Sequence, residues 1–140
     1  MKSPFIDTNI IIRYLTKENA DKVKACYALF KKAEENRITI TTSESVIAEA
    51  VFVLASKKHY NLSPLEIKKR LTPILLLRGL KLDHRQTYLR ALELYAVYGL
   101  DFEDCLSIAH MERRQLTNIY SYDQDFDRVA EINRIEPLFR

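Results

Sequence analysis

Short apolar runs alternate with longer amphipathic segments along the chain, and this alternation predicts a mixture of strands and helices. The runs rich in β-branched residues are typical of buried strands, whereas apolar residues spaced by three and four are typical of helices. We expect strands at 3–7, 38–41, 80–82, 118–122 and 135–138. We expect helices, counted with their caps, at about 9–16, 19–36, 41–60, 63–79, 83–98 and 101–115, and one helical turn from Asp125. Strands that alternate with helices indicate an α/β fold, in which a parallel sheet is covered on both faces.

Several helix ends carry recognisable signals. Asn19 and Asp83 are expected to cap the helices that follow them, and Thr41-Thr42-Ser43-Glu44 reads as a capping box. Pro73 falls inside a predicted helix, where it is expected to kink or split it. Pro137 is compatible only with an edge strand.

The composition favours one globular domain over residues 1–140. The chain is 47% hydrophobic, and its two glycines and four prolines are too few for a flexible linker. Its longest apolar stretches, Ala50–Ala55 and Pro73–Leu77, are far shorter than the about 20 residues of a membrane span. The N-terminus lacks a signal-peptide pattern, so we expect a cytoplasmic protein with no membrane partner. Cys26 and Cys105 fall in helical patterns and are expected to be buried free thiols.

Positive charge is concentrated between residues 57 and 81. This segment has seven Lys or Arg residues and one acid, Glu66, while the whole chain has a net charge of +3. Such a segment can contact a polyanion. A solvated helix face is the simpler interpretation.

Asp7 follows the first predicted strand in Phe5-Ile6-Asp7-Thr8-Asn9. In open α/β sheets, functional groups gather at the carboxyl ends of the strands. Asp7 is therefore a candidate site residue, although it can also serve as the cap of the next helix.

Glu49 is the only ionisable residue between Val46 and Ala55. It lies at the border of an apolar helix face, where a carboxylate is costly unless it is paired or bound to a cation. A Lys or Arg partner inside the fold is the alternative. Glu44 is assigned to the capping box and the helix dipole, and not to the site.

Two later segments each hold several acids. In the helix 101–109, Asp101 fits a cap and Glu103 points to the polar face, so Asp104 is the candidate at the edge of the buried stripe. In Ser121-Tyr122-Asp123-Gln124-Asp125-Phe126-Asp127, Asp123 leaves a strand as Asp7 does. Asp125 resembles a cap and Asp127 a first-turn acid, so Asp123 is preferred.

Four carboxylates in one cleft need a compensating cation, and their own segments supply no Lys or Arg next to them. Oxygen ligands favour Mg²⁺ or Mn²⁺, which support phosphoryl chemistry with water as the nucleophile. Histidine is absent from these segments, which disfavours zinc. Two glycines in the whole chain exclude a phosphate-binding glycine-rich loop.

These motifs, in this order and over almost the whole chain, resemble the PIN domain family and its VapC-type toxins of toxin–antitoxin pairs. The resemblance implies a three-layer α/β/α sandwich with a short parallel sheet and a Mg²⁺- or Mn²⁺-dependent endoribonuclease. By motif match, Asp7, Glu49, Asp104 and Asp123 form the acidic metal site, and Asn9 and Ser121 orient the acids or the water. It further implies an RNA substrate, an inhibitory antitoxin protein and a homodimer. The basic segment 57–81 then becomes a candidate to guide RNA, to bind the antitoxin, or to form a dimer through Leu65, Leu71 and 74–77.

Three other interpretations compete with an active nuclease. One is a catalytically inactive PIN-like module that binds RNA or protein. A phosphoacceptor receiver domain wants paired acids after the first strand and a late lysine, whereas Thr8 follows Asp7. A phosphatase with an aspartate nucleophile wants an acid at position 9, where Asn9 stands.

Overall fold

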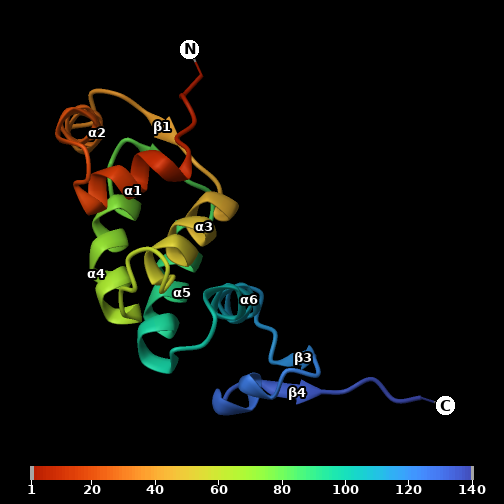
Figure 1. The fold of residues 1–140 in the computed structure, drawn as a ribbon. Helices are drawn as coiled ribbons and strands as arrows, with labels where there is room; N and C mark the ends of the chain where they lie inside the picture. Colours follow the sequence, from red (N-terminus) through yellow and green to blue (C-terminus); the bar gives the residue numbers. More distant parts are fainter. Residues whose placement is uncertain (1, 140) are drawn as a thin grey trace.

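The computed structural model describes residues 2–139, which form helices joined by very short strands (Figure 1). The elements are, in order, α1 (Thr8–Thr16), α2 (Ala20–Glu34), β1 (Ile40–Thr41), α3 (Glu44–Ala55), α4 (Pro64–Leu75), β2 (Leu80–Lys81), α5 (Arg85–Tyr98), α6 (Phe102–Arg113), β3 (Asn118–Tyr120), the 3-10 helix η1 (Gln124–Arg128) and β4 (Asn133–Ile135). The prediction of an α/β fold with short parallel strands is confirmed. Within residues 2–139, no helix is both long enough and apolar enough to cross a membrane.

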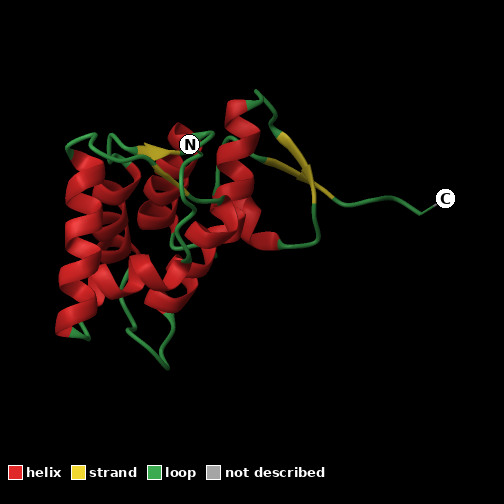
Figure 2. Ribbon diagram, turned by 90° about the horizontal axis from the view of Figure 1, so that it is seen from above, coloured by secondary structure: helices red, strands yellow, loops and turns green. Residues whose placement is uncertain are grey.

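The strands form two separate parallel sheets. In the first, β1 pairs with β2, and Phe5 adds one parallel bridge to Thr41. In the second, β3 pairs with β4 in the register Ile119 to Arg134. Figures 1 and 2 both place this second sheet outside α6, with the C-terminal residues extending away from the helices. The expected strand at 3–7 is thus reduced to a single bridge, and the last strand lies at 133–135 and not at 135–138.

A single apolar core joins the helices to β1 and β2. Its largest fully buried side chains come from α1, α3 to α6, β1 and β2: Ile11, Ile40, Ile47, Leu54, Ile67, Leu71, Leu75, Leu80, Leu92 and Ile108. Burial of each such side chain stabilises the fold by roughly 1.5–3 kcal/mol relative to its exposure. Cys26 and Cys105 are buried free thiols, as predicted.

Packing excludes part of the expected dimer surface. Leu71, Ile74 and Leu75 belong to the core, so they cannot contact another subunit. Only Leu65 and Leu76 of that apolar set are half exposed.

One predicted helix cap is confirmed here, and two are wrong. Asn19 accepts a hydrogen bond from the Lys22 N–H at 3.1 Å, as expected. The capping box is wrong, because Ser43 is the cap of α3 and Glu44 bonds instead to His110. Asp83 does not cap α5, since that helix starts after His84, whose φ is 59°.

The middle helices are shorter than predicted. Helix α3 ends at Ala55, because Ser56 is already extended. Helix α4 accommodates Pro73 near its C-terminal end and stops at Leu75, before Gly79.

Candidate active site

Asp7 and Glu49 form an N-terminal acidic group at the start of α1. Asp7 is the N-cap of α1, and its Oδ1 accepts the Thr8 N–H at 2.7 Å. The Thr8 hydroxyl donates to Glu49 Oε2 at 2.8 Å. These three residues and Asn9 line a hollow of about 310 Å³. The cap role proposed for Asp7 is therefore real, and it leaves the second carboxylate oxygen available to the hollow.

Glu49 does not have the environment that its apolar neighbours indicated. Its side chain is exposed, on the solvent side of α3, while Ala50 beside it is fully buried. Within residues 2–139 it forms no ion pair with Lys or Arg, and its polar partner is the Thr8 hydroxyl. The helix turns Glu49 out of the core, so the cost of burial that singled it out does not arise.

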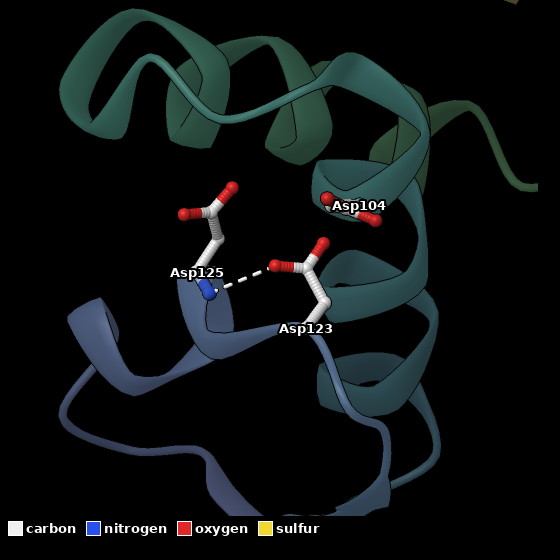
Figure 3. A group of neighbouring side chains, drawn as sticks. All are labelled: Asp104, Asp123 and Asp125. Atoms are coloured by element: carbon white, nitrogen blue, oxygen red, sulfur yellow. Dashed lines mark hydrogen bonds between the residues drawn. The ribbon is translucent and has the colours of Figure 1, made fainter.

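Asp104, Asp123 and Asp125 form a C-terminal acidic group (Figure 3). Asp104 lies in the first turn of α6, and the other two lie at the start of η1. Each offers a carboxylate oxygen, and these oxygens lie within 4.8 Å of one another. Among the described residues, these are the only three or more His, Cys, Asp or Glu side chains whose ligand atoms lie this close together.

The loop before η1 is held by two local hydrogen bonds. The Asp123 N–H donates to Ser121 Oγ at 3.0 Å, and the Asp125 N–H donates to Asp123 Oδ1 at 2.9 Å. Ser121 thus supports the backbone of an acid, in keeping with the positioning role that the resemblance implies for it.

The C-terminal acidic group has unfavourable electrostatics without a cation. Burial raises the pKa of Asp104 above its usual value, and the negative charges of Asp123, Asp101 and Asp125 raise it further. A nearby divalent cation reverses this effect, because it favours the charged carboxylate. The group therefore fits a positively charged ligand.

Cys105 is not a ligand or nucleophile of this site. Burial, together with the charges of Asp104 and Asp101, raises the pKa of its thiol to about 12. The thiolate, which is the reactive and metal-binding form, is therefore absent at neutral pH.

Asp125 is the residue that the sequence interpretation missed. It was assigned to capping, but Asp123 is the cap of η1, and the Asp125 side chain stays free to join the group. Asp101 is the N-cap residue of α6 and Asp127 lies in the first turn of η1, as expected. Asp101 makes no capping hydrogen bond with its side chain, and Asp127 pairs with Arg134 at 3.0 Å.

The four predicted acids lie in two places within one chain. Asp7 and Glu49 are not part of the group whose oxygens lie within 4.8 Å. They line their own hollow on α1 and α3. The physical reason is strand pairing: β3 pairs with β4 and not with the segment that ends at Asp7.

The donor set indicates which ions would fit. All ligands of the C-terminal acidic group are carboxylate oxygens, which suit hard divalent cations such as Mg²⁺ or Mn²⁺. Within residues 2–139, no histidine or thiolate joins this group.

Comparison with known families gives a match over nearly the whole chain. The family model described as PIN domain matches residues 5–132, a range that contains all five acids of the two groups. No curated protein matches the sequence.

Proposed function

The chain belongs to the PIN domain family, which indicates a nuclease, and from this membership we propose a divalent-metal-dependent endoribonuclease. The observation that carries the proposal is the set of three carboxylates with oxygens within 4.8 Å of one another. Such a set can hold the divalent ion that activates water for phosphodiester hydrolysis. Water is the proposed nucleophile, since these segments offer no better one.

The proposed site residues are Asp7, Glu49, Asp104 and Asp123, to which the structure adds Asp125 as a candidate. Asp104, Asp123 and Asp125 would hold Mg²⁺ or Mn²⁺. When bound, such an ion lowers the pKa of water and neutralises charge on the phosphate oxygens. Asn9 and Ser121 are proposed to orient the acids, Ser121 through its bond with the Asp123 N–H.

We assign part of the RNA path to a basic hollow beside β1 and β2, which is separate from the two acidic groups. A pocket of about 690 Å³ at the carboxyl ends of β1 and β2 has Arg78 and Lys81 in its wall, together with Glu44 and Asp83. Arg85 also lines this pocket, but its guanidinium donates to the Leu80 carbonyl. Positive side chains there would contact phosphates and offset the repulsion between RNA and the acids. Arg70 lies outside this pocket, and its side chain is held by a hydrogen bond to the Leu15 carbonyl and an ion pair with Glu66.

The biological role that we propose is the cytoplasmic toxin of a type II toxin–antitoxin pair, held inactive by its antitoxin and acting as a homodimer. The support is the resemblance of the acidic motifs to VapC-type toxins. Expression of the chain alone should arrest growth, and Asp104→Asn should relieve the arrest. Continued arrest by a stable Asp104→Asn protein would contradict the nuclease as its cause.

The biochemical test is cleavage of single-stranded RNA with Mg²⁺ or Mn²⁺. Cleavage should stop with a chelator and fall at least about 100-fold in Asp104→Asn and Asp123→Asn, a loss of about 2.7 kcal/mol in transition-state stabilisation. Glu103→Gln is the matched control, because this exposed neighbour of Asp104 lies outside the group. Equal cleavage by all three variants would refute the assignment.

The alternative is a PIN-like module that binds RNA or protein without cleaving it. The observation in its favour is the separation of the two acidic groups within one chain. RNA binding that is unchanged by chelator, with no cleavage under any metal, would select this alternative.

A further inference from the structure

The N-terminal strand segment 4–6 uses only one of its two edges. The Ile6 N–H donates to the Thr41 carbonyl, and the Thr41 N–H donates to the Pro4 carbonyl, both at 2.8 Å. Backbone groups of successive strand residues point to opposite edges, so the N–H and C=O of Phe5 point away from β1. Within residues 2–139 these two groups have no hydrogen-bond partner, and the Phe5 side chain is 58% exposed. Segment 4–6 therefore presents a free edge for a parallel strand.

Within residues 2–139, the edge of β3 that faces away from β4 makes no backbone hydrogen bond. The Ser121 N–H donates to the Ile135 carbonyl at 3.0 Å, which directs residue 121 toward β4. The backbone groups of Tyr120 and Tyr122 consequently point to the opposite edge. Both tyrosines are strongly exposed, at 72% and 69%. Exposed edges flanked by aromatic side chains favour pairing with another strand.

One chain cannot join its own two edges in the observed structure. Figure 1 places β3 beyond α6, whereas segment 4–6 lies beside β1 at the other end of the molecule. The C-terminal unit 117–135 is anchored where it is by Phe126 and Val129, which are 4% and 3% exposed. Arg128 also donates to the Tyr98 carbonyl at 2.6 Å. Each copy therefore offers two compatible edges that are not paired with each other.

Only one register aligns both the hydrogen bonds and the acids. In a parallel pair, the N–H and C=O of Phe5 bond to the two residues on either side of the residue that lies opposite Phe5. If these are Tyr120 and Tyr122, Phe5 lies opposite Ser121, and Asp7 lies opposite Asp123. Parallel strands bring their carboxyl ends to the same edge, so the two acidic groups then meet.

We propose that two copies of this chain associate by mutual strand addition, β3 of each copy pairing in parallel with segment 4–6 of its partner. Asp7 and Glu49 would then share one site with Asp123 of the partner subunit, together with the carboxylates grouped with it. Two such contacts close a symmetric dimer with two composite sites. This inference rests on the proposed function, in that the two acidic groups are taken as parts of one centre.

Disulfide trapping tests the pairing without any need for activity. The Phe5→Cys variant with one affinity tag is mixed with the Ser121→Cys variant with another tag. In the proposed register these two residues lie opposite each other, and paired strands about 4.8 Å apart are within disulfide range. Mild oxidation should give a covalent dimer that carries both tags. Cys26 and Cys105 do not interfere, because they are 6% and 0% exposed. Val97→Cys, on the exposed face of α5, replaces Phe5→Cys as the control and should give no mixed dimer.

A proline substitution tests the free edge itself. Phe5→Pro removes the outward N–H and leaves the Ile6 and Pro4 bonds to Thr41 intact, so the protein should become monomeric. Phe5→Ala keeps the N–H and should remain dimeric. Sedimentation measures both variants, and circular dichroism shows whether each is folded.

Activity then reports on the composite site. Asp7→Asn and Asp123→Asn proteins, each inactive alone, should recover roughly a quarter of wild-type cleavage when unfolded together and refolded at equal amounts, because half of the randomly assorted dimers hold one intact site of two. Failure to trap the mixed dimer, or a disulfide formed within single chains of the Phe5→Cys/Ser121→Cys double variant, would overturn strand addition. A mixed dimer trapped from the two cysteine variants, together with a wild-type protein that cleaves no RNA, would refute the proposed function and leave the pairing established.

Discussion

The Thr8 hydroxyl donates a 2.8 Å hydrogen bond to Glu49 Oε2, and it thereby joins α1 to α3 across 41 positions of sequence. Thr8 is only 7% exposed, whereas Glu49 is exposed. The bond fixes the orientation of a carboxylate that packing alone would leave mobile. Asp7 caps the same helix by accepting the Thr8 N–H. Thr8 therefore bonds to both acids, to Asp7 through its backbone and to Glu49 through its side chain.

We expect Thr8→Val to lower RNA cleavage without unfolding the protein. A hydrogen bond to a charged group contributes about 1.5–3 kcal/mol, so kcat/KM should fall roughly 10- to 100-fold. Thr8→Ser keeps the hydroxyl and is the matched control. The rates of cleavage of one RNA by the three proteins measure the effect. Equal rates for Thr8→Val and Thr8→Ser would show that the bond has no part in catalysis.

Mg²⁺ or Mn²⁺ should raise the melting temperature of the chelator-treated protein. An ion that binds only the folded state stabilises it by about 2.7 kcal/mol at 100 times its Kd, which corresponds to several degrees. The increase should disappear in the Asp104→Asn/Asp123→Asn double variant and persist in Glu103→Gln. Thermal scans against ion concentration provide the measurement, and an increase that persists in the double variant would place the ion elsewhere.

In the metal-free protein, Asp104→Asn should stabilise the fold as the pH rises. The pKa of Asp104 is raised in the folded state, so the folded protein binds a proton at Asp104 more tightly than the unfolded chain does. The contribution of Asp104 to stability therefore falls as the pH rises from about 4, the ordinary aspartate value, through its raised folded pKa. The variant lacks this loss, and its melting temperature relative to wild type should increase over that window. A difference that is constant with pH would contradict the repulsion among these acids.

The two glycines should respond differently to alanine. A Cβ on Gly79 would lie 2.7 Å from the Ala33 carbonyl oxygen and even closer to that of Ile38. Backbone atoms cannot move aside easily, so Gly79→Ala should cost about 1–3 kcal/mol. Gly99→Ala meets no atom within 4 Å, but the φ of 66° should cost about 1 kcal/mol. Urea unfolding of both variants compares the two costs, and Gly99→Asn, which tolerates that φ, should lose less than Gly99→Ala. An equal loss for both alanine variants would show that the space at Gly79 is not limiting.

Local features of this chain followed from short-range chemistry. Asn19 caps α2 because its side chain reaches the Lys22 N–H within one turn, and Asp7 caps α1 by accepting the N–H of the next residue, Thr8. The helical positions of Asp104 and the loop position of Asp123 follow from apolar spacing in the same way. A prediction failed where a distant residue bound the side chain concerned: Glu44 of the predicted capping box forms a hydrogen bond with His110 instead.

The grouping of the acids depended on long-range pairing, which periodicity does not contain. A pattern of apolar residues predicts that 3–7 and 118–122 are extended, but not which edges pair, because any strand offers two equivalent rows of N–H and C=O groups. Packing of Phe126 and Val129 against the core holds β3 with β4, beyond α6, and thereby separates Asp123 from Asp7. Residue types and helix positions were thus readable from the linear chain, whereas the division of the carboxylates into two groups arises from the three-dimensional packing of its C-terminal unit.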